Sequence, residues 1–298
     1  MRENPASGPK RSSARGVNMR HEQRFEAALR EQRVAARGEL GVACTAGRTR
    51  VDRLYQEGAA KIRMPRTVGD PLEAVLINTA GGLTGGDRLD WLIHVGDGAS
   101  ATVTTQTCEK VYRAASDVAK VGCRVSVGAG GRLAWLPQET IVFDNSAFRR
   151  TIDIDLASDA EALVVEATVF GRRAMGESVG RAFFADRWRA RREGRLVHAE
   201  DFAIGPDASR QLAAPPALGG ATCVATLLAL SEDAEQRLDA ARAIIGDNGG
   251  SASAWTVAGS GKLLARLTAD DSYALRKRLI PLIELLNGRA GLPKVWTL

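Results

Sequence analysis

Apolar and polar residues alternate along most of the chain, from about residue 48 to residue 230. Ile152–Leu156 shows the period of two that is typical of a half-buried strand, and Leu72–Ile77 is a nearly continuous apolar run typical of a strand buried on both faces. Glycine-bearing turns, such as 96–98 and 128–131, separate these segments. Ten or more short strands predict a mainly β fold, with stacked antiparallel sheets in an irregular sandwich or solenoid-like arrangement.

Helical periodicity returns only near the C-terminal end. Residues 231–245 begin with Ser231, a candidate N-cap, followed by acidic residues. Residues 270–287 place apolar side chains on one face, and Pro281 is expected to kink that helix. A shorter helix over 22–36 rests on few apolar positions. We therefore expect a few helices, most of them after the strands.

The positive charge of the chain is concentrated in its first residues. The 298 residues carry a formal net charge of +6, and residues 1–24 hold six basic against two acidic side chains. Residues 1–20, rich in Pro, Ser, Gly and Arg, are predicted to form a disordered basic tail, with Met19 as an alternative start to Met1. The remainder is close to neutral, so we expect no nucleic-acid partner. Residues 48–298 are predicted to form a single β-rich domain.

Targeting signals and cysteine usage indicate a cytoplasmic protein. No apolar run approaches the roughly 18 residues that a membrane-spanning helix needs. The basic N-terminal residues are not followed by the apolar stretch of a secretory signal, so no membrane partner is expected. The four cysteines form no CxxC pair, and the three histidines are scattered. This pattern predicts reduced thiols and disfavours a preformed zinc site.

A glycine-rich segment, NTAGGLTGGDR at Asn78–Arg88, follows the apolar strand that begins at Leu72. Its glycines permit tight turns, and Thr84 and Asp87 add short oxygen-bearing side chains. The segment lacks the lysine and hydroxyl pair of a phosphate-binding P-loop. Both a structural turn and a binding loop remain open for it.

A second polar segment runs from Thr104 to Arg113. Strand alternation places Thr105 and Glu109 on one face, and Gln106 and Cys108 on the other. A polar strand of this kind is typical of the solvent edge of a sheet. A polar binding surface is the alternative.

Several later carboxylates stand alone among hydroxyl groups. Glu139 and Asp144 lie five residues apart around a strand, so they do not converge like the carboxylates of a glycosidase unless a bulge intervenes. Glu166 follows four apolar residues of a strand, where burial requires an arginine partner or a polar cavity. Glu177 ends the segment Gly171–Glu177. The chain offers no Ser-His-Asp set and no dense metal cage, and a β-rich hydrolase using Asp/Glu pairs is kept as an alternative function.

Four segments together resemble the urease accessory protein D family (UreD, called UreH in some organisms). They are NTAGGLTGGDRL at 78–89, TTQTCEKVYRA at 104–114, LPQETIVFD at 136–144 and GRRAMGE at 171–177. Supporting matches are GAAKIRMPR at 58–66, LGGA at 218–221 and LPKVW at 292–296. The resemblance runs in order from about residue 48 to the C-terminus, and it implies a mostly β protein with helices near that end.

The resemblance also implies a non-enzymatic urease maturation factor. Proteins similar to this one bind apo-urease and bridge it to the F accessory protein, which recruits the GTPase G protein. Together they support nickel delivery to urease, and a polar passage through the D protein is a proposed route. No tightly bound cofactor is implied, only nickel in transit. By motif position, the candidate passage-lining or partner-contact residues are Thr84, Asp87, Thr105, Gln106, Glu109, Glu139, Asp144, Glu166 and Glu177.

Weak oxygen ligands suit such a passage, because a cage of histidines and cysteines would retain Ni²⁺. Asp87, Cys108 and Glu166 are the candidates for transient nickel contact. The family motif commonly has small residues after TTQ, where this chain has Thr107 and Cys108. The Cys108 thiol is either a soft nickel contact or a small buried hydrophobic group, and we favour the second interpretation.

Overall fold

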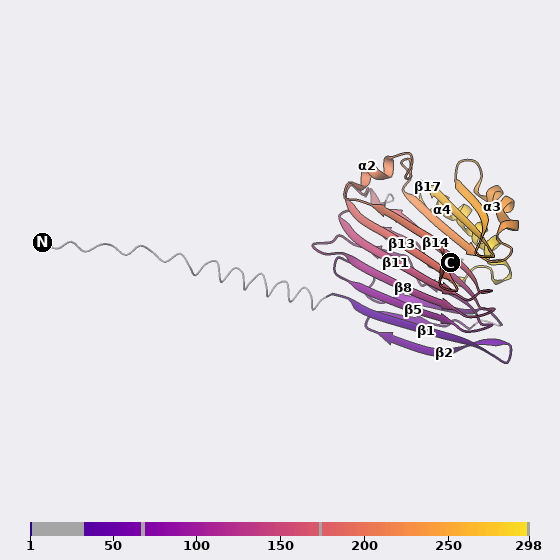
Figure 1. Cartoon of the computed structure of the whole chain (residues 1–298). Coiled ribbons are helices and arrows are strands. Elements are labelled where there is room, and N and C mark those ends of the chain that lie inside the picture. Colours follow the sequence, from indigo (N-terminus) through magenta and orange to yellow (C-terminus); the bar gives the residue numbers. More distant parts are fainter. Residues whose placement is uncertain (2–32, 67–68, 173–174, 297–298) are drawn as a thin grey trace. The chain divides into compact units, whose positions relative to one another are not determined.

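Short strands alternate between two β-sheets along the chain. The computed structural model describes residue 1 and residues 33–66, 69–172 and 175–296 (Figure 1). From Val34 to the C-terminal end, the described residues belong to one compact unit. The predicted tail over 1–20, with Met19, lies outside the described residues, apart from Met1.

The first sheet has seven strands, drawn side by side in Figure 1. In spatial order they are β14 (Arg195–Ile204), β13 (Ala182–Arg192), β11 (Ser146–Leu156), β8 (Ala119–Val127), β5 (Arg88–Val95), β1 (Ala35–Thr45) and β2 (Arg48–Glu57). The predicted helix over 22–36 is wrong at its C-terminal end, because Ala35 and Ala36 pair with β5 as part of β1. The described β structure therefore begins ahead of residue 48.

The second sheet has ten strands. Its main path is β16 (Gly250–Val257), β17 (Ser260–Ala269), β15 (Cys223–Leu230), β12 (Glu161–Phe170), β9 (Arg132–Leu136), β6 (Ser100–Thr105), β4 (Leu72–Asn78) and β3 (Ala60–Arg63). Two three-residue strands complete it, because β10 (Thr140–Val142) pairs with both β12 and β7 (Glu109–Val111).

The mainly β class, the stacked sheets and the solenoid-like arrangement are confirmed, but the antiparallel pairing is wrong for much of both sheets. Neighbours from β1 through β5, β8 and β11 to β13 are parallel, and so are those from β4 through β6 and β9 to β12. The reason lies in the turns. Residues 96–98 and 128–131 carry the chain from one sheet to the other, whereas a hairpin would return it beside the strand it left.

These turns stack on one another through side chains and backbone. The Oδ1 atom of Asp97 accepts a hydrogen bond from Ala129 N at 2.9 Å, and Oδ1 of Asp159 accepts one from Gly130 N at 2.9 Å. A Cβ atom on Gly128 would lie 2.2 Å from Asp97 Oδ1 and 2.9 Å from the backbone N of Asp97, so a larger residue there would shift the neighbouring turn. The glycine-bearing turns thus hold successive coils in register.

Helices cover the outer face of the ten-stranded sheet. The covering elements are the 3₁₀ turn η2 (Glu235–Arg237), α3 (Leu238–Ile245), α4 (Ser272–Asn287), η3 (Gly288–Ala290) and η4 (Lys294–Trp296). The short helix α2 (Ala208–Ala213) lies instead against β14 and buries Ala208 and Leu212 in the core between the sheets. The second C-terminal helix predicted from periodicity is confirmed at Ser272–Asn287. The first is confirmed at Leu238–Ile245, but its predicted start is wrong: Ser231 lies in a turn, where its Oγ donates to Asp233 Oδ1 at 2.8 Å and does not cap α3. Asp271 caps α4 by accepting a hydrogen bond from Ala274 N at 2.7 Å, and Pro281 lies inside that helix.

Two apolar cores result from this layering. The larger lies between the sheets and contains Phe148, Phe184 and Trp188 of the seven-stranded sheet. The second lies between the ten-stranded sheet and the helices, where Leu279 packs with Leu227 of β15. The ten-stranded sheet is therefore the middle layer of three.

Candidate functional site

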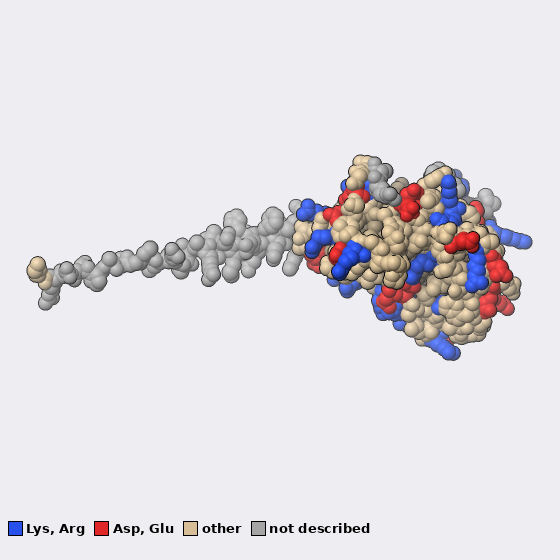
Figure 2. Space-filling view, turned by 90° about the horizontal axis from the view of Figure 1, so that it is seen from above, with Lys and Arg blue, Asp and Glu red and all other residues tan. Residues whose placement is uncertain are grey.

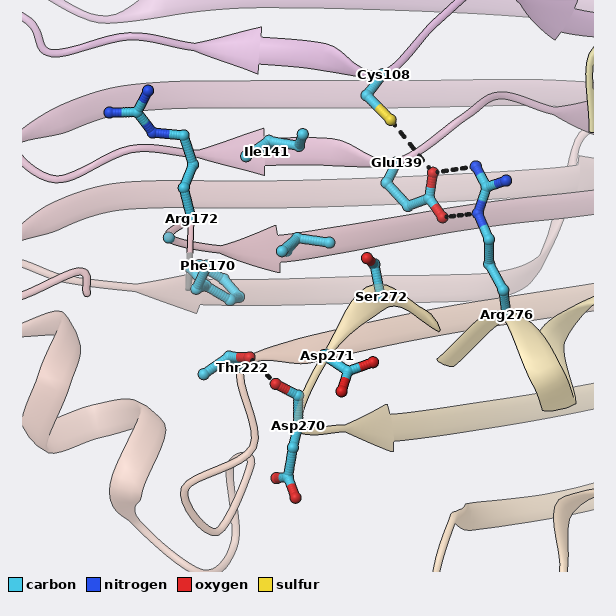
Figure 3. Close-up of a pocket in the computed structure, with 12 residues that line it drawn as sticks. Cys108, Glu139, Ile141, Phe170, Arg172, Thr222, Asp270, Asp271, Ser272 and Arg276 are labelled. Atoms are coloured by element: carbon cyan, nitrogen blue, oxygen red, sulfur yellow. Dashed lines mark hydrogen bonds and ion pairs between the residues drawn. The ribbon is translucent and has the colours of Figure 1, made fainter. Parts of the chain in front are cut away.

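Two small pockets meet at Cys108. The larger has a volume of about 310 Å³, and its polar lining includes Cys108, Glu139, Arg172, Asp271 and Arg276 (Figure 3). The smaller has a volume of about 150 Å³, and its polar lining includes Asn78, Thr105, Gln106, Cys108 and Glu109. Because Cys108 lines both, the pockets are neighbours.

Glu139 is the best-anchored carboxylate of the larger pocket. It lies between β9 and β10 and is only 2% exposed. Arg276 of α4 donates from Nε to Oε1 at 2.6 Å and from Nη2 to Oε2 at 2.7 Å, as Figure 3 shows. Burial alone would raise the pKa of Glu139, but these hydrogen bonds and the guanidinium charge outweigh it and lower that pKa. Glu139 is therefore ionised at neutral pH.

The Cys108 thiol is a neutral group in this setting. Its Sγ donates a hydrogen bond to Oε2 of Glu139 at 3.4 Å. Burial, followed by the charge of that carboxylate, raises the pKa of Cys108 to about 11. A thiolate ligand would form here only if a cation displaced the proton.

Glu109 dominates the smaller pocket. Asn78 Nδ2 donates to both of its carboxylate oxygens, at 3.2 and 3.3 Å. Burial raises the pKa of Glu109 to about 7, despite the hydrogen bond from Asn78. Thr105 Oγ1 accepts from Gln138 N at 2.9 Å, while Gln106 is exposed. The smaller pocket thus holds a carboxylate that exchanges its proton near neutral pH.

A buried ionic cluster lies between the two sheets. Arg150 of β11 donates from Nε to Asp186 Oδ1 at 3.1 Å and from Nη2 to Oδ2 at 2.5 Å, and its Nη1 forms an ion pair with Glu166 of β12. Indole N–H groups complete the cluster, with Trp135 Nε1 donating to Glu166 and Trp188 Nε1 to Asp186, each at 2.9 Å. Burial raises the pKa of Glu166 and so does the charge of Asp186, while Arg150 opposes both. Two carboxylates thus share one cation.

In the glycine-rich segment, the side-chain oxygens of Asp87 and Thr84 form hydrogen bonds with backbone groups. Asp87 is 4% exposed, and its carboxylate accepts from Val34 N at 2.9 Å and from Thr84 N at 2.7 Å. Thr84 Oγ1 donates to Arg113 O at 2.9 Å. Neither Thr84 nor Asp87 lines either pocket.

Asp144 and Glu177 also bind backbone and arginine. Asp144 Oδ1 accepts from Gly180 N at 2.9 Å and from Arg181 N at 3.0 Å. Glu177 pairs with Arg172 Nε at 2.5 Å, and that guanidinium lies 4.2 Å from the Phe143 ring centroid. Neither carboxylate lines the larger pocket, and only Glu177 contacts a residue that does, Arg172.

The positional candidates therefore fall into three groups. The structure brings Thr105, Gln106, Cys108, Glu109 and Glu139 together at the pockets. It places Glu166 in the ionic cluster, and the remaining candidates at backbone-holding positions. In the described parts of the chain, no three His, Cys, Asp or Glu side chains converge as a metal-binding group.

Sequence reasoning missed the arginines that complete these sites. A buried carboxylate signals that a cation is needed, but Arg276 lies 137 residues from Glu139, and Asp186 lies 36 residues from Arg150. Nothing in the sequence selects these arginines among the many present. The acidic residues Asp270 and Asp271, which line the larger pocket, were missed as well.

These features define a class of protein: a solenoid-like β protein with buried ion pairs and two adjoining polar pockets. The chain belongs to the UreD urease accessory protein family, whose family model matches residues 34–297. It is 63% identical over 267 residues to the urease accessory protein UreD of Mesorhizobium japonicum, covering 90% of this chain and 95% of that protein.

Other similar proteins carry the same family name. The chain is 58% identical over 267 residues to UreD of Brucella suis, with 90% and 95% of the two chains covered. It is 57% identical over 275 residues to UreD 1 of Brucella anthropi, with 91% and 97% covered. Family membership implies a role in urease maturation. Among the described residues, every helix is too short or too polar to cross a membrane.

Proposed function

We propose that this chain is a non-enzymatic urease maturation factor that passes nickel toward apo-urease through a polar route. The observation that carries the proposal is the pair of pockets that share Cys108, with Glu109 in one and Glu139 in the other. In this proposal the F accessory protein binds the chain and the GTPase G protein is recruited through it. Nickel is cargo, and the chain keeps no resident cofactor.

The chemistry of the pockets supports transit over storage. Glu139 already satisfies Arg276 and the Cys108 thiol, so it offers a passing cation only a shared carboxylate. Glu109 loses its proton near neutral pH and can recover it after the ion leaves. A carboxylate shared with a guanidinium, or one that must first lose its proton, binds Ni²⁺ less firmly than a cage of imidazole and thiolate ligands. Release toward the next protein is then favourable.

The alternative hydrolase gains no support from the geometry. Glu139 is held by Arg276, and Asp144 is held by the backbone of Gly180 and Arg181. An acid–base pair needs two carboxylates that converge on one bond. The relatives are named as accessory proteins, which agrees with a non-enzymatic role.

The test is urease activation in cells that carry the urease genes, with this chain replaced by the Glu109→Gln or the Glu139→Gln variant. We expect each variant to copurify with apo-urease and the F protein at the wild-type yield but to lower urease activity and urease-bound nickel severalfold. Glu284→Gln, on the exposed side of α4, is the matched control and should leave both unchanged.

Three results would count against the proposal. Full nickel loading by both pocket variants would remove the pockets from the route. Loss of copurification would show that these carboxylates act in folding or docking. A wild-type chain that fails to copurify with any urease component would overturn the role in maturation itself.

A further inference from the structure

The outer face of the seven-stranded sheet is a wide surface that the described helices leave open. The helices α3 and α4 pack on the ten-stranded sheet, in the second core. Seven strands at about 4.8 Å spacing and about nine residues at 3.3 Å rise give a face of roughly 1,000 Å². A stable interface buries about 800 Å² on each partner, so this face is large enough for one.

This face is basic. Its four central strands, β5, β8, β11 and β13, point seven basic and three acidic side chains away from the core, a net charge of +4. These are Arg88, Lys120, Arg124, Arg149, Arg187, Arg189 and Arg191, with Asp90, Asp153 and Asp155. Residues 34–298 carry 33 basic and 31 acidic side chains, a net charge of only +2. The rest of that unit is therefore net acidic, and the basic excess belongs to this face.

The cations on this face are incompletely neutralised. Arg88, Lys120 and Arg149 occupy one row on three adjacent strands, where like charges in register repel. Arg88 pairs with Asp90 at 2.6 Å. Among the described residues, Lys120, Arg124 and Arg187 form no ion pair. On β13 the ion pairs are formed by the other two outward arginines, Arg189 with Asp201 and Arg191 with Asp153.

The basic face also has a groove. Its volume is about 630 Å³, and it crosses the strands β2, β1, β5, β8 and β11. Gly41 lacks a side chain there, and His94 Nδ1 lies 2.8 Å from Ser126 Oγ, which keeps that ring against its neighbour. The groove itself is close to neutral, because its lining holds three arginines, Arg37, Arg53 and Arg124, and three carboxylates, Glu39, Asp52 and Asp155. Figure 2, which views the molecule from above, shows blue and red side chains interspersed on that side.

We infer that the outer face of the seven-stranded sheet docks an acidic protein surface, whose carboxylates meet Lys120, Arg124 and Arg187 and one of whose side chains enters the groove. Charge complementarity selects this occupant. The chain's own residues 1–33 carry eight basic and four acidic side chains, and a second copy would present the same basic face. The inference rests on the proposed function, in which the acidic partner is apo-urease or the F protein.

The test compares two double charge reversals in the purified full-length chain. Lys120→Glu with Arg124→Glu alters β8 in the middle of the face, and Lys277→Glu with Arg289→Glu makes the same charge change at exposed sites outside this sheet. Binding to purified apo-urease and to purified F protein is measured by calorimetry at low and high salt. We expect the β8 variant to lose about a hundredfold in affinity for one partner, because like charges then face each other. The control should stay within about twofold.

The salt series separates docking from folding. Wild-type affinity for that partner should fall as salt rises, and the milder Lys120→Gln with Arg124→Gln variant should show a shallower salt dependence with an unchanged circular dichroism spectrum. Equal affinities for the β8 variant and the control would overturn the docking surface while leaving the proposed function intact. If the wild-type chain bound neither partner, the proposed function would fail first.

Discussion

The two sheets share a core but differ on their outer faces. The ten-stranded sheet is covered by helices, and strand β12 is buried at eight of its ten positions. The seven-stranded sheet has an open outer face, and β13 alternates between buried positions and positions that are partly buried or, at Arg187, exposed. A strand in the middle layer is thus a nearly continuous apolar run in the sequence, whereas a strand in an outer layer keeps the alternation of apolar and polar residues.

The same difference governs where charge is tolerated. Arg150 points from β11 into the space between the sheets and is 5% exposed, whereas Arg124 points outward from β8. The inward arginine needs two carboxylates and a threonine hydroxyl, while the outward one stays hydrated. Of these two arginines in one sheet, Arg150 is therefore needed to neutralise buried carboxylates, whereas Arg124 is not needed for packing.

Replacing each arginine by methionine tests this difference most directly. Arg150→Met leaves Glu166 and Asp186 buried without a cation and should lower the free energy of unfolding by about 3–5 kcal/mol. Arg124→Met should change it by no more than about 0.5 kcal/mol. Urea denaturation at pH 7 measures both values. Similar losses at the two positions would show that the outward face is as tightly packed as the interior.

The two outer faces can be compared in the same way with leucines. Leu279 on α4 is fully buried against the ten-stranded sheet, and Leu92 on β5 lies half-buried on the open face. Leu279→Ala should cost about 2–5 kcal/mol, because it leaves a cavity under the helix. Leu92→Ala should cost about 1 kcal/mol or less, since water already reaches that position. An equally large loss for Leu92→Ala would indicate that another part of the chain covers the open face.

Local patterns in the sequence predicted what is local in the structure. The β class, the C-terminal helices and the burial of Glu166 follow from residue periods and from the cost of isolated charge. The direction of the strands did not follow, because a turn such as 96–98 has the same composition whether it closes a hairpin or crosses between sheets. The segment from Ala35 to Thr45 was missed for a similar reason: its strand pairs with β5, far along the chain.

The candidate site shows the same limit. The motif positions led to Cys108, Glu109 and Glu139, which the structure brings together at two pockets. The partner Arg276 is supplied by a helix more than a hundred residues later, and only the tertiary fold places it there. Some polar side chains in a motif accept hydrogen bonds from the backbone, as Asp87 does, and do not line a pocket. Sequence alone does not separate these structural residues from the pocket residues.

The last comparison concerns pH, and it contrasts the two pocket carboxylates. The pKa of Glu109 is raised to about 7 from 4.5 by burial, so the folded chain holds this proton over a range in which the unfolded chain has lost it. The stabilisation is complete below about pH 4.5 and is lost as the pH rises toward 7, with a slope of at most about 1.4 kcal/mol per pH unit. Glu109→Gln should remove this slope from urea denaturation curves recorded between pH 5 and pH 7.

The pKa of Glu139 is shifted in the opposite direction to that of Glu109, so its contribution to stability changes with pH in the opposite sense. Its pKa is lowered, because Arg276 stabilises the ionised form more than burial disfavours it. Its contribution to stability is therefore present above the ordinary pKa of a glutamate and is lost only as the pH falls below it. Glu139→Gln should leave the slope between pH 5 and pH 7 unchanged. If both variants altered that slope alike, the two carboxylates would titrate as one coupled site, and the distinction between a proton-exchanging pocket and an arginine-held pocket would be wrong.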